Sequence, residues 1–287
     1  MRAVNPLLAP TSDSPALGLF REHFGLPSET FLDASPESLL EAVARSFARI
    51  PYENLTKIVK DEREGAPERA RRGPLEVLRD HIELGTGGTC FSLTAAMLHV
   101  LRGLGFSAEP LLADRPYGVN THCAITVDLN GSPHLIDPGF LIVKPIPLEI
   151  TAETRIETPF NELTLLPGRG GTTLELSTAQ DGRRTPRITF KTDPVDSSEL
   201  LRAWDASFEW DMMRYPLLTR VQGGRQLYLQ GNRFQIRTRA GAERRRVDAT
   251  ELPRLIEEHF GLRSTVAVTA LEALGRKGEV HAGAFAR

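Results

Sequence analysis

Cys90 is the residue of this sequence whose surroundings best suit a nucleophile. It follows a turn rich in glycine, with Gly87 and Gly88, and a segment of helical apolar spacing runs from Phe91 to Leu104. We therefore place Cys90 at the N-terminus of a helix, where unpaired N–H groups stabilise a thiolate and lower the thiol pKa. The glycines leave the sulfur uncovered, and the N–H groups of Cys90 and Phe91 could hold the oxyanion of a tetrahedral acyl intermediate.

A histidine and an aspartate share a predicted hairpin further along the chain. The segment from His122 to Leu129 alternates, Asn130-Gly131 is the strongest short hairpin signal, and the returning strand ends at Asp137. With this two-residue turn Ala124 faces Asp137, so His122 and Asp137 are diagonal neighbours on the less apolar face, and the opposite face is the buried one. We predict a Cys-His-Asp triad in which Asp137 orients His122 and His122 is the base for the thiol.

The other histidines and the second cysteine do not complete this site. His99 lies nine positions after the nucleophile, about half a turn round the predicted helix. His134 shares the buried face of the hairpin, and Cys123 points away from His122. Because these side chains do not converge as metal ligands, we reject a zinc site.

Apolar periodicity predicts the elements that position these residues. Helical spacing runs from Ser14 to about Leu104, apart from an arginine-rich stretch from Lys60 to Arg72 that we interpret as solvated. Short alternating strands and then a mixture of strands and a helix follow; the clearest are strands at 163–166, 172–177, 187–191, 226–230 and 233–239 and a helix at 251–260.

We predict from this pattern a chain of mixed helices and sheets in three units. A helical unit carries the nucleophile over 1–105, an antiparallel sheet or barrel carries the histidine and aspartate over 106–203, and a mixed α and β unit covers 204–287. The sequence has no internal repeat and no long glycine or serine tract, so we expect the units to pack as one body.

Composition excludes several classes of protein. The 287 residues include 35 basic and 37 acidic side chains, a formal net charge of -2, so nothing favours a nucleic-acid partner. Two cysteines cannot make a disulfide framework and suit a reducing compartment. With no signal peptide and no membrane-length apolar run, we expect a cytoplasmic protein.

Four short motifs give the chain a family resemblance. They are Pro51-Tyr52-Glu53-Asn54-Leu55, Gly87-Gly88-Thr89-Cys90-Phe91, Thr121-His122 and Asp137-Pro138-Gly139-Phe140. In this order they resemble the arylamine N-acetyltransferase family. The resemblance implies an α+β fold with a helical bundle, an antiparallel β-barrel and an α/β lid around the triad, the cysteine-protease-like arrangement of that family.

The resemblance also implies a ping-pong reaction. Cys90 would take an acetyl group from acetyl-CoA, the co-substrate, and pass it to an arylamine, arylhydrazine or related amine, without a metal. The chain departs from the family pattern at Thr86 and Ser92, where the family usually has Arg and Glu, and at Pro138, where it usually has Val. Since both charges are lost together, we expect a neutral replacement that keeps the turn.

Other functions share these residues. An amide synthase of the same family would move a carrier-bound polyketide acyl chain to an amine, a transglutaminase-like enzyme or peptidase would use the same triad, and an inactive binding protein would not use it. Phe91 and Phe140 are candidates for lining the acceptor pocket. The cluster Arg244–Arg246 is interpreted as solvated, so no residue is assigned to coenzyme binding.

Overall fold

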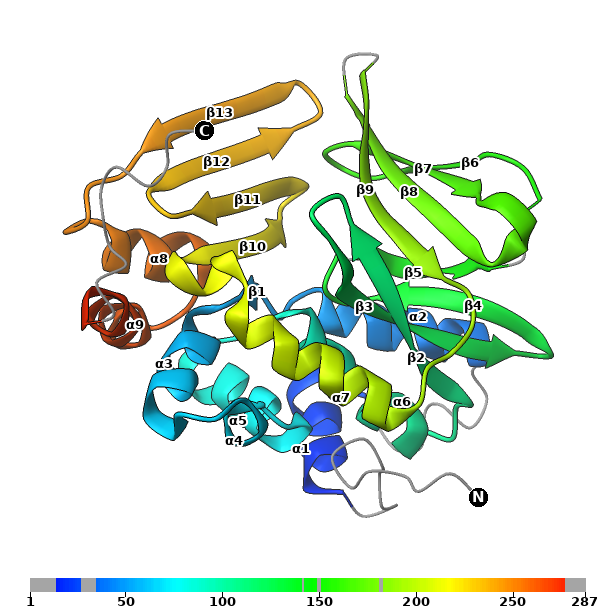
Figure 1. Ribbon diagram of the computed structural model, residues 1–287, viewed down its shortest axis with the longest axis horizontal. Helices are drawn as coiled ribbons and strands as arrows, with labels where there is room; N and C mark the ends of the chain where they lie inside the picture. Colours follow the sequence, from blue (N-terminus) through cyan, green and yellow to red (C-terminus); the bar gives the residue numbers. More distant parts are fainter. Residues whose placement is uncertain (1–13, 27–34, 141, 149–150, 181–182, 277–287) are drawn as a thin grey trace.

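The computed structural model describes residues 14–26, 35–140, 142–148, 151–180 and 183–276. Its helices lie mainly in the first third of the chain, with α7 crossing in front of them and two more at the end (Figure 1). The α-helices are α1 Pro15–Phe24, α2 Pro36–Phe47, α3 Leu55–Glu64, α4 Pro67–Ala70, α5 Pro74–Leu84, α6 Cys90–Gly103, α7 Ser197–Ala206, α8 Leu252–Phe260 and α9 Ser264–Arg276. Short 3-10 turns are η1 Arg169–Gly171, η2 Ser207–Glu209 and η3 Asp211–Arg214.

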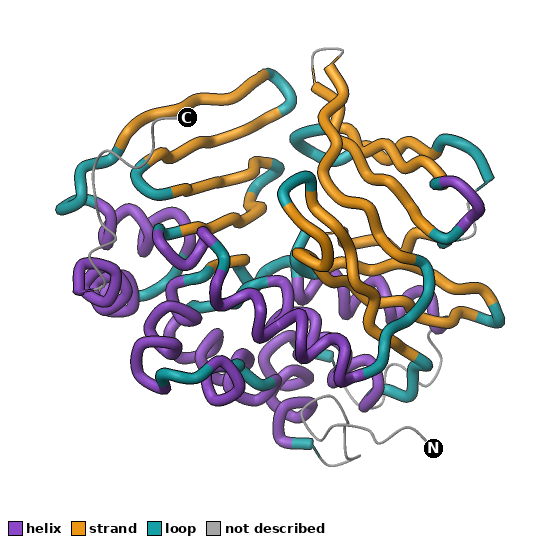
Figure 2. Tube along the Cα trace, in the orientation of Figure 1, coloured by secondary structure: helices purple, strands orange, loops and turns teal. Residues whose placement is uncertain are grey.

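The strands form two antiparallel sheets, which stand side by side above the helices (Figures 1 and 2). The larger sheet has the order β5-β4-β3-β2-β9-β8-β7-β6 and curls into a half-barrel, and the smaller has the order β1-β10-β11-β12-β13. The strands are β1 Tyr52–Glu53, β2 Ala108–Arg115, β3 Gly118–Leu129, β4 Ser132–Asp137, β5 Ile142–Pro147, β6 Thr154–Glu157, β7 Glu162–Pro167, β8 Thr173–Gln180, β9 Arg183–Lys191, β10 Leu217–Gln222, β11 Arg225–Gln230, β12 Arg233–Thr238 and β13 Gly241–Arg246.

The helix that carries the nucleophile lies at the centre of the first core. Twelve successive residues of α6, from Cys90 to Leu101, are buried, because the helix is covered by α1, α2 and α5 on one side and by β2 and β3 on the other. Most of these residues are apolar, which suits a helix that is covered on both sides. The helix predicted to follow the glycine turn is therefore confirmed, and Cys90 is its first residue.

The predicted hairpin is confirmed in its register. Leu129 pairs with Ser132 and Ile125 with Ile136, and Asn130 has the positive φ of 56° that this tight turn requires. The expectation that only one face of the hairpin is buried was wrong. Ile125 packs against the helices, while Ala124 on the other face is also fully buried, inside the half-barrel. The His–Asp pair therefore lies inside the molecule, between the helices and the curled sheet.

The smaller sheet is backed by the last two helices. Leu218, Leu229 and Phe234 from its strands share a core with Phe260 of α8 and Ala267 of α9. Its first strand comes from the Pro51–Leu55 segment, so the end of the chain packs directly on the helical unit. Within the described residues, no helix is both long enough and apolar enough to cross a membrane.

Candidate active site

Cys90 opens α6 at the wall of a deep cleft. Thr89 precedes it in extended conformation as the N-cap, so the thiol sits beside the first N–H groups of the helix, which have no partner within the helix itself. The Cys90 side chain is 3% exposed and lines the cleft. Gly139 closes over it: a Cβ at that position would lie 2.8 Å from Cys90 Cβ and 3.2 Å from His122 Cε1, so only glycine fits there.

His122 and Asp137 meet as the hairpin register predicts. His122 Nε2 lies 2.6 Å from Asp137 Oδ2, and both side chains are fully buried. The other carboxylate oxygen, Oδ1, accepts a hydrogen bond of 2.9 Å from the Phe140 N–H. These contacts fix the tautomer, because Nε2 donates to the carboxylate and Nδ1 is left as the basic atom.

The charges around the thiol favour an ion pair between the Cys90 thiolate and the His122 imidazolium. A hydrogen bond with Cys123, and then the hydrogen bond and charge of His122, hold the pKa of Cys90 well below its ordinary value although burial raises it. Burial lowers the pKa of His122, but the Asp137 carboxylate outweighs it and the net shift is upward. The sequence analysis set Cys123 apart from this group. In the structure Cys123 shares a buried cluster with Cys90 and lowers its pKa, while its own Sγ lies 3.4 Å from Thr94 Oγ1.

Arg115 is a further charged neighbour that the sequence analysis missed. Its Nη2 lies 3.2 Å from His122 Nδ1, and its guanidinium carbon lies 5.7 Å from the centre of the Phe140 ring. Its charge lowers the pKa of both Cys90 and His122, so it stabilises the thiolate and opposes the imidazolium. Only the pairing of β2 with β3 brings Arg115 to the site, because Ala113, two residues before it, faces His122. The sequence analysis did not predict this pairing.

The two thiols differ in a way that alkylation would reveal. Burial, above all, raises the pKa of Cys123 well above its ordinary value, opposite to the shift of Cys90. We expect iodoacetamide at neutral pH to modify Cys90 at least about tenfold faster than Cys123, because only thiolates react and each pKa unit changes their proportion tenfold. Peptide mass spectrometry against time measures both rates. The rate at Cys90 should decline only as the pH falls through its lowered pKa, and equal rates at the two thiols would contradict the assignment.

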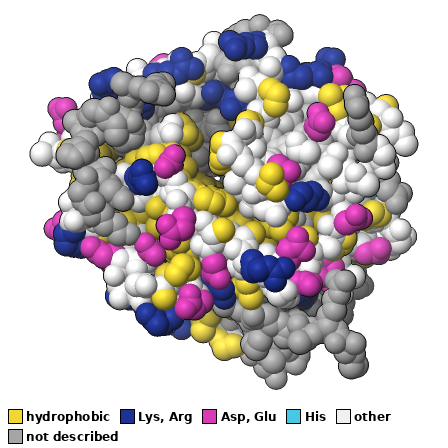
Figure 3. All heavy atoms as spheres, viewed as in Figure 1, with side chains coloured by type: hydrophobic (Ala, Val, Ile, Leu, Met, Phe, Trp, Pro, Cys, Tyr) yellow, Lys and Arg dark blue, Asp and Glu magenta, His cyan; other side chains and the backbone are white. Residues whose placement is uncertain are grey.

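The cleft has a volume of about 1310 Å³ and lies between the two sheets. In Figure 3, hydrophobic side chains gather around a hollow near the middle of this face. Phe140 lines the cleft together with Tyr52 and Tyr228. Phe91 is fully buried in the core, with its ring 6.1 Å from Trp204, and is not among the residues that line the cleft. The acceptor-pocket role of both phenylalanines stays a prediction.

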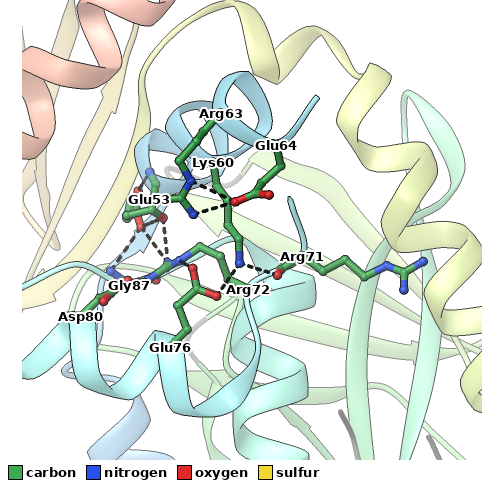
Figure 4. A network of polar contacts seen from close by, with 10 residues as sticks. Glu53, Lys60, Arg63, Glu64, Arg71, Arg72, Glu76, Asp80 and Gly87 are labelled. Carbon is green, nitrogen blue, oxygen red and sulfur yellow. Dashed lines mark hydrogen bonds and ion pairs between the residues drawn. The ribbon is translucent and has the colours of Figure 1, made fainter. Parts of the chain in front are cut away.

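The glycine turn is held by two charged side chains, Arg72 and Glu53, of which the sequence analysis placed Arg72 in solvent. Arg72 lies in the segment between α4 and α5, and Figure 4 shows its side chain beside Gly87 of the turn. It donates hydrogen bonds to Gly87 O and, at 2.7 Å, to Thr56 Oγ1. Glu53 lies 3.7 Å from the same guanidinium and accepts a bond of 3.3 Å from the Gly87 N–H. A buried cation therefore binds the Gly87 carbonyl and a buried anion binds the Gly87 N–H, and we call this pair of contacts the charge clamp.

One expectation about this region was wrong. Arg72 is only 3% exposed, although the stretch from Lys60 to Arg72 was interpreted as solvated. Thr86 and Ser92 are both buried, and their neutral replacement of the two charges that the resemblance implies stays a prediction. Arg244, Arg245 and Arg246 are exposed on β13, as predicted.

A buried lysine is a second charge that the sequence did not reveal. Lys57 is 3% exposed, its Nζ donates a bond of 2.8 Å to Ser207 O, and it lies 4.1 Å from the centre of the Phe208 ring. Burial lowers its pKa to about 7, while the charges of Cys90 and Asp61 act in the opposite direction. Among the described residues, no group of three or more His, Cys, Asp or Glu side chains could hold a metal ion.

Comparison with known proteins places this arrangement among N-acetyltransferases. A family model described as N-acetyltransferase matches residues 36–268. The arylamine N-acetyltransferase of Nocardia farcinica has a similar structure, with a TM-score of 0.76 and 20% identity over 95% of this chain and 99% of that one. The Mycobacterium marinum arylamine N-acetyltransferase in complex with CoA gives a TM-score of 0.73 and 19% identity over 91% and 98%.

A variant of the N-arylamine acetyltransferase of Mycobacterium smegmatis is also similar in structure. It gives a TM-score of 0.72 and 24% identity, covering 90% of this chain and 98% of that one. No curated protein sequence matches the chain.

Proposed function

Since the chain belongs to the arylamine N-acetyltransferase family, we propose that it moves an acetyl group from acetyl-CoA, through a thioester on Cys90, to an arylamine, arylhydrazine or related amine. The observation that carries this proposal is the buried pair of His122 and Asp137, 2.6 Å apart, beside a thiol of lowered pKa on the wall of a cleft. The cleft is large enough for an acyl thioester and an amine to reach the sulfur in turn.

The first half-reaction forms the thioester. The Cys90 thiolate attacks the acetyl carbonyl carbon, and the tetrahedral oxyanion lies at the N-terminus of α6, where free N–H groups and the helix dipole stabilise negative charge. The bond from that carbon to the coenzyme sulfur then breaks. His122, which holds the proton taken from Cys90, gives it to the departing thiolate.

The second half-reaction reverses these roles. The amine attacks the acetyl carbon of the Cys90 thioester, and His122 Nδ1 takes the proton that the amine loses. The Cys90 thiolate leaves, and the amide is released. Asp137 keeps Nε2–H bonded throughout, so that Nδ1 faces the reacting atoms at each step. The triad formed by Cys90, His122 and Asp137 is our proposal for the catalytic residues.

Several wider features belong to the same proposal. The domains that we propose are a helical bundle over residues 1–105, a barrel over 106–203 and a lid over 204–287. The ligands would be small molecules, an acyl thioester and an amine, with acetyl-CoA as co-substrate. Both cysteines are free, which supports a cytoplasmic location.

Intact mass spectrometry tests the first half-reaction directly. The protein is mixed with acetyl-CoA in the absence of any amine, beside a Cys90→Ala variant and a Cys123→Ala variant. We expect one acetyl group on the wild type and on Cys123→Ala, and none on Cys90→Ala. If the wild type gains no acetyl group but is charged by a carrier-bound acyl thioester, the acetyltransferase proposal fails in favour of an amide synthase.

A further inference from the structure

Three arginines from three different strands line the cleft that contains Cys90. Arg115 ends β2, Arg187 lies in β9 of the half-barrel, and Arg237 lies in β12 of the smaller sheet. They are far apart in the sequence, and only the packing of the two sheets brings them to one cavity. The charges of Arg237 and Arg115 both lower the pKa of Arg187, so each of these two cations is close enough to Arg187 to repel it.

None of these arginines forms an ion pair with a described acidic residue. Arg187 Nε donates to Thr178 Oγ1 at 2.9 Å, and Arg115 contacts His122. Arg237 Nε is buried without a hydrogen-bond partner. Of the carboxylates on the cleft wall, Glu157 pairs with Arg239 at 3.1 Å and Asp211 lies 3.8 Å from Arg214; Glu209 lines the cleft as well.

This arrangement is unfavourable in the free protein. Burial is the main cause of the lowered pKa of both Arg187 and Arg237, and a second arginine adds to each shift, Arg237 for the first and Arg244 for the second. Partly buried cations that repel one another cost free energy unless an anion joins them. All three arginines line the cleft, and guanidinium groups match the two oxygens of a carboxylate.

We propose that Arg115, Arg187 and Arg237 bind the carboxylate of an acid-bearing arylamine, the acyl acceptor. The acceptor's identity as an amine rests on the proposed function. Arg115 contacts His122 itself, so the anion lies close to the reacting atoms. The phosphates of coenzyme A are separated from its sulfur by the long uncharged pantetheine arm, which argues against Arg115 as a phosphate site when the thioester is at Cys90. Phe140 and Tyr228, which line the same cleft, suit the aromatic ring.

Binding without turnover is the first test. Calorimetry with Cys90→Ala protein compares 4-aminobenzoate with 4-aminobenzamide, which has the same ring and amine but no charge. We expect the acid to bind about 10- to 100-fold more tightly, the usual gain from hydrogen bonds to a charged group. Because no acyl transfer is needed, this result stands even if acetyl-CoA is not the donor. Equal affinities for the two compounds would overturn the proposal.

Variants then locate the site. In Arg187→Met and Arg237→Met, the preference for 4-aminobenzoate over 4-aminobenzamide, as the ratio of affinities and of kcat/KM, should fall at least about tenfold. Arg184→Met is the matched control, because Arg184 lies on the same strand but pairs with Glu153 at 3.0 Å and is not on the cleft wall. It should keep the preference.

Two other results would reassign the arginines. If Arg187→Met weakens CoA but not dephospho-CoA, and leaves the preference for 4-aminobenzoate intact, the cluster serves a coenzyme phosphate and the proposal fails. If the protein instead prefers succinyl-CoA over butyryl-CoA in charging Cys90, and does not distinguish the two acceptors, the carboxylate belongs to the acyl group and the assignment to the acceptor is wrong.

Discussion

Asp137→Asn should reduce the rate of acyl-enzyme formation from acetyl-CoA by roughly 10³- to 10⁴-fold, the loss expected when the orienting carboxylate of such a triad becomes an amide. In the structure Asp137 accepts a hydrogen bond of 2.6 Å from His122 Nε2 and a second hydrogen bond from the Phe140 N–H. An amide can donate to Nε2 instead, and the proton then moves to Nδ1, which no longer accepts from the thiol. Quenched-flow mass measurement of the charged protein gives the rate.

The pH dependence of the same reaction gives a second readout. Asp137 raises the pKa of His122. In Asp137→Asn, the part of the pH–rate profile that reports the titration of His122 should therefore shift to lower pH. Asp128→Asn is the matched control, because Asp128 lies in the same hairpin but is exposed beside the turn, where it accepts from the Gly131 N–H. If the Asp137→Asn protein is folded and forms the acyl-enzyme at a rate within tenfold of the wild-type rate, Asp137 does not belong to the proposed triad.

Arg72→Met should lower the free energy of unfolding by about 3–5 kcal/mol, the usual cost of removing one partner of a buried ion pair. Glu53, which is fully buried, would lose the guanidinium 3.7 Å away. The Gly87 carbonyl would lose its donor as well, and with it the anchor of the turn that precedes Cys90. Urea unfolding followed by circular dichroism measures the change, and the alkylation rate of Cys90 reports on the turn.

A double variant separates the loss of a partner from a general loss of packing. Arg72→Met combined with Glu53→Gln should be more stable than Arg72→Met alone, because the fully buried carboxylate is then gone and the other two partners of Arg72, Glu76 and Asp80, are partly exposed. Arg69→Met is a control from the neighbouring helix α4, where Arg69 contacts the Glu64 carbonyl at the surface. If Arg72→Met costs no more than Arg69→Met, the charge clamp does not hold the turn.

Local features of the sequence were enough to predict the helix start at Cys90 and the pairing of His122 with Asp137. The glycines before Cys90 and the apolar run after it indicate a helix start, which the structure has at that residue. Asn130-Gly131 fixes the turn, and a two-residue turn leaves one register, which brings His122 and Asp137 within 2.6 Å. Both inferences succeed because a helix start and a tight hairpin are set by neighbouring residues.

The burial of charged side chains whose partners lie in distant segments could not be predicted from the sequence. Arg72 was interpreted as solvated because a run of arginines usually is, yet it is buried against Gly87 and Glu53. Lys57 gave no signal either, since its partner Ser207 is 150 residues away. The burial of a charged side chain depends on the partners that tertiary packing supplies, and these do not follow from periodicity.

The sequence by itself determined the order of the elements, the hairpin register and the residues of the proposed triad, since each depends on spacing within a short segment. Only the tertiary structure decided what surrounds them. It covers both faces of the hairpin, brings Gly139 against Cys90, and gathers Arg115, Arg187 and Arg237 in one cleft. The physical reason is that the two sheets meet through contacts between residues far apart in the chain, and no local pattern encodes that meeting.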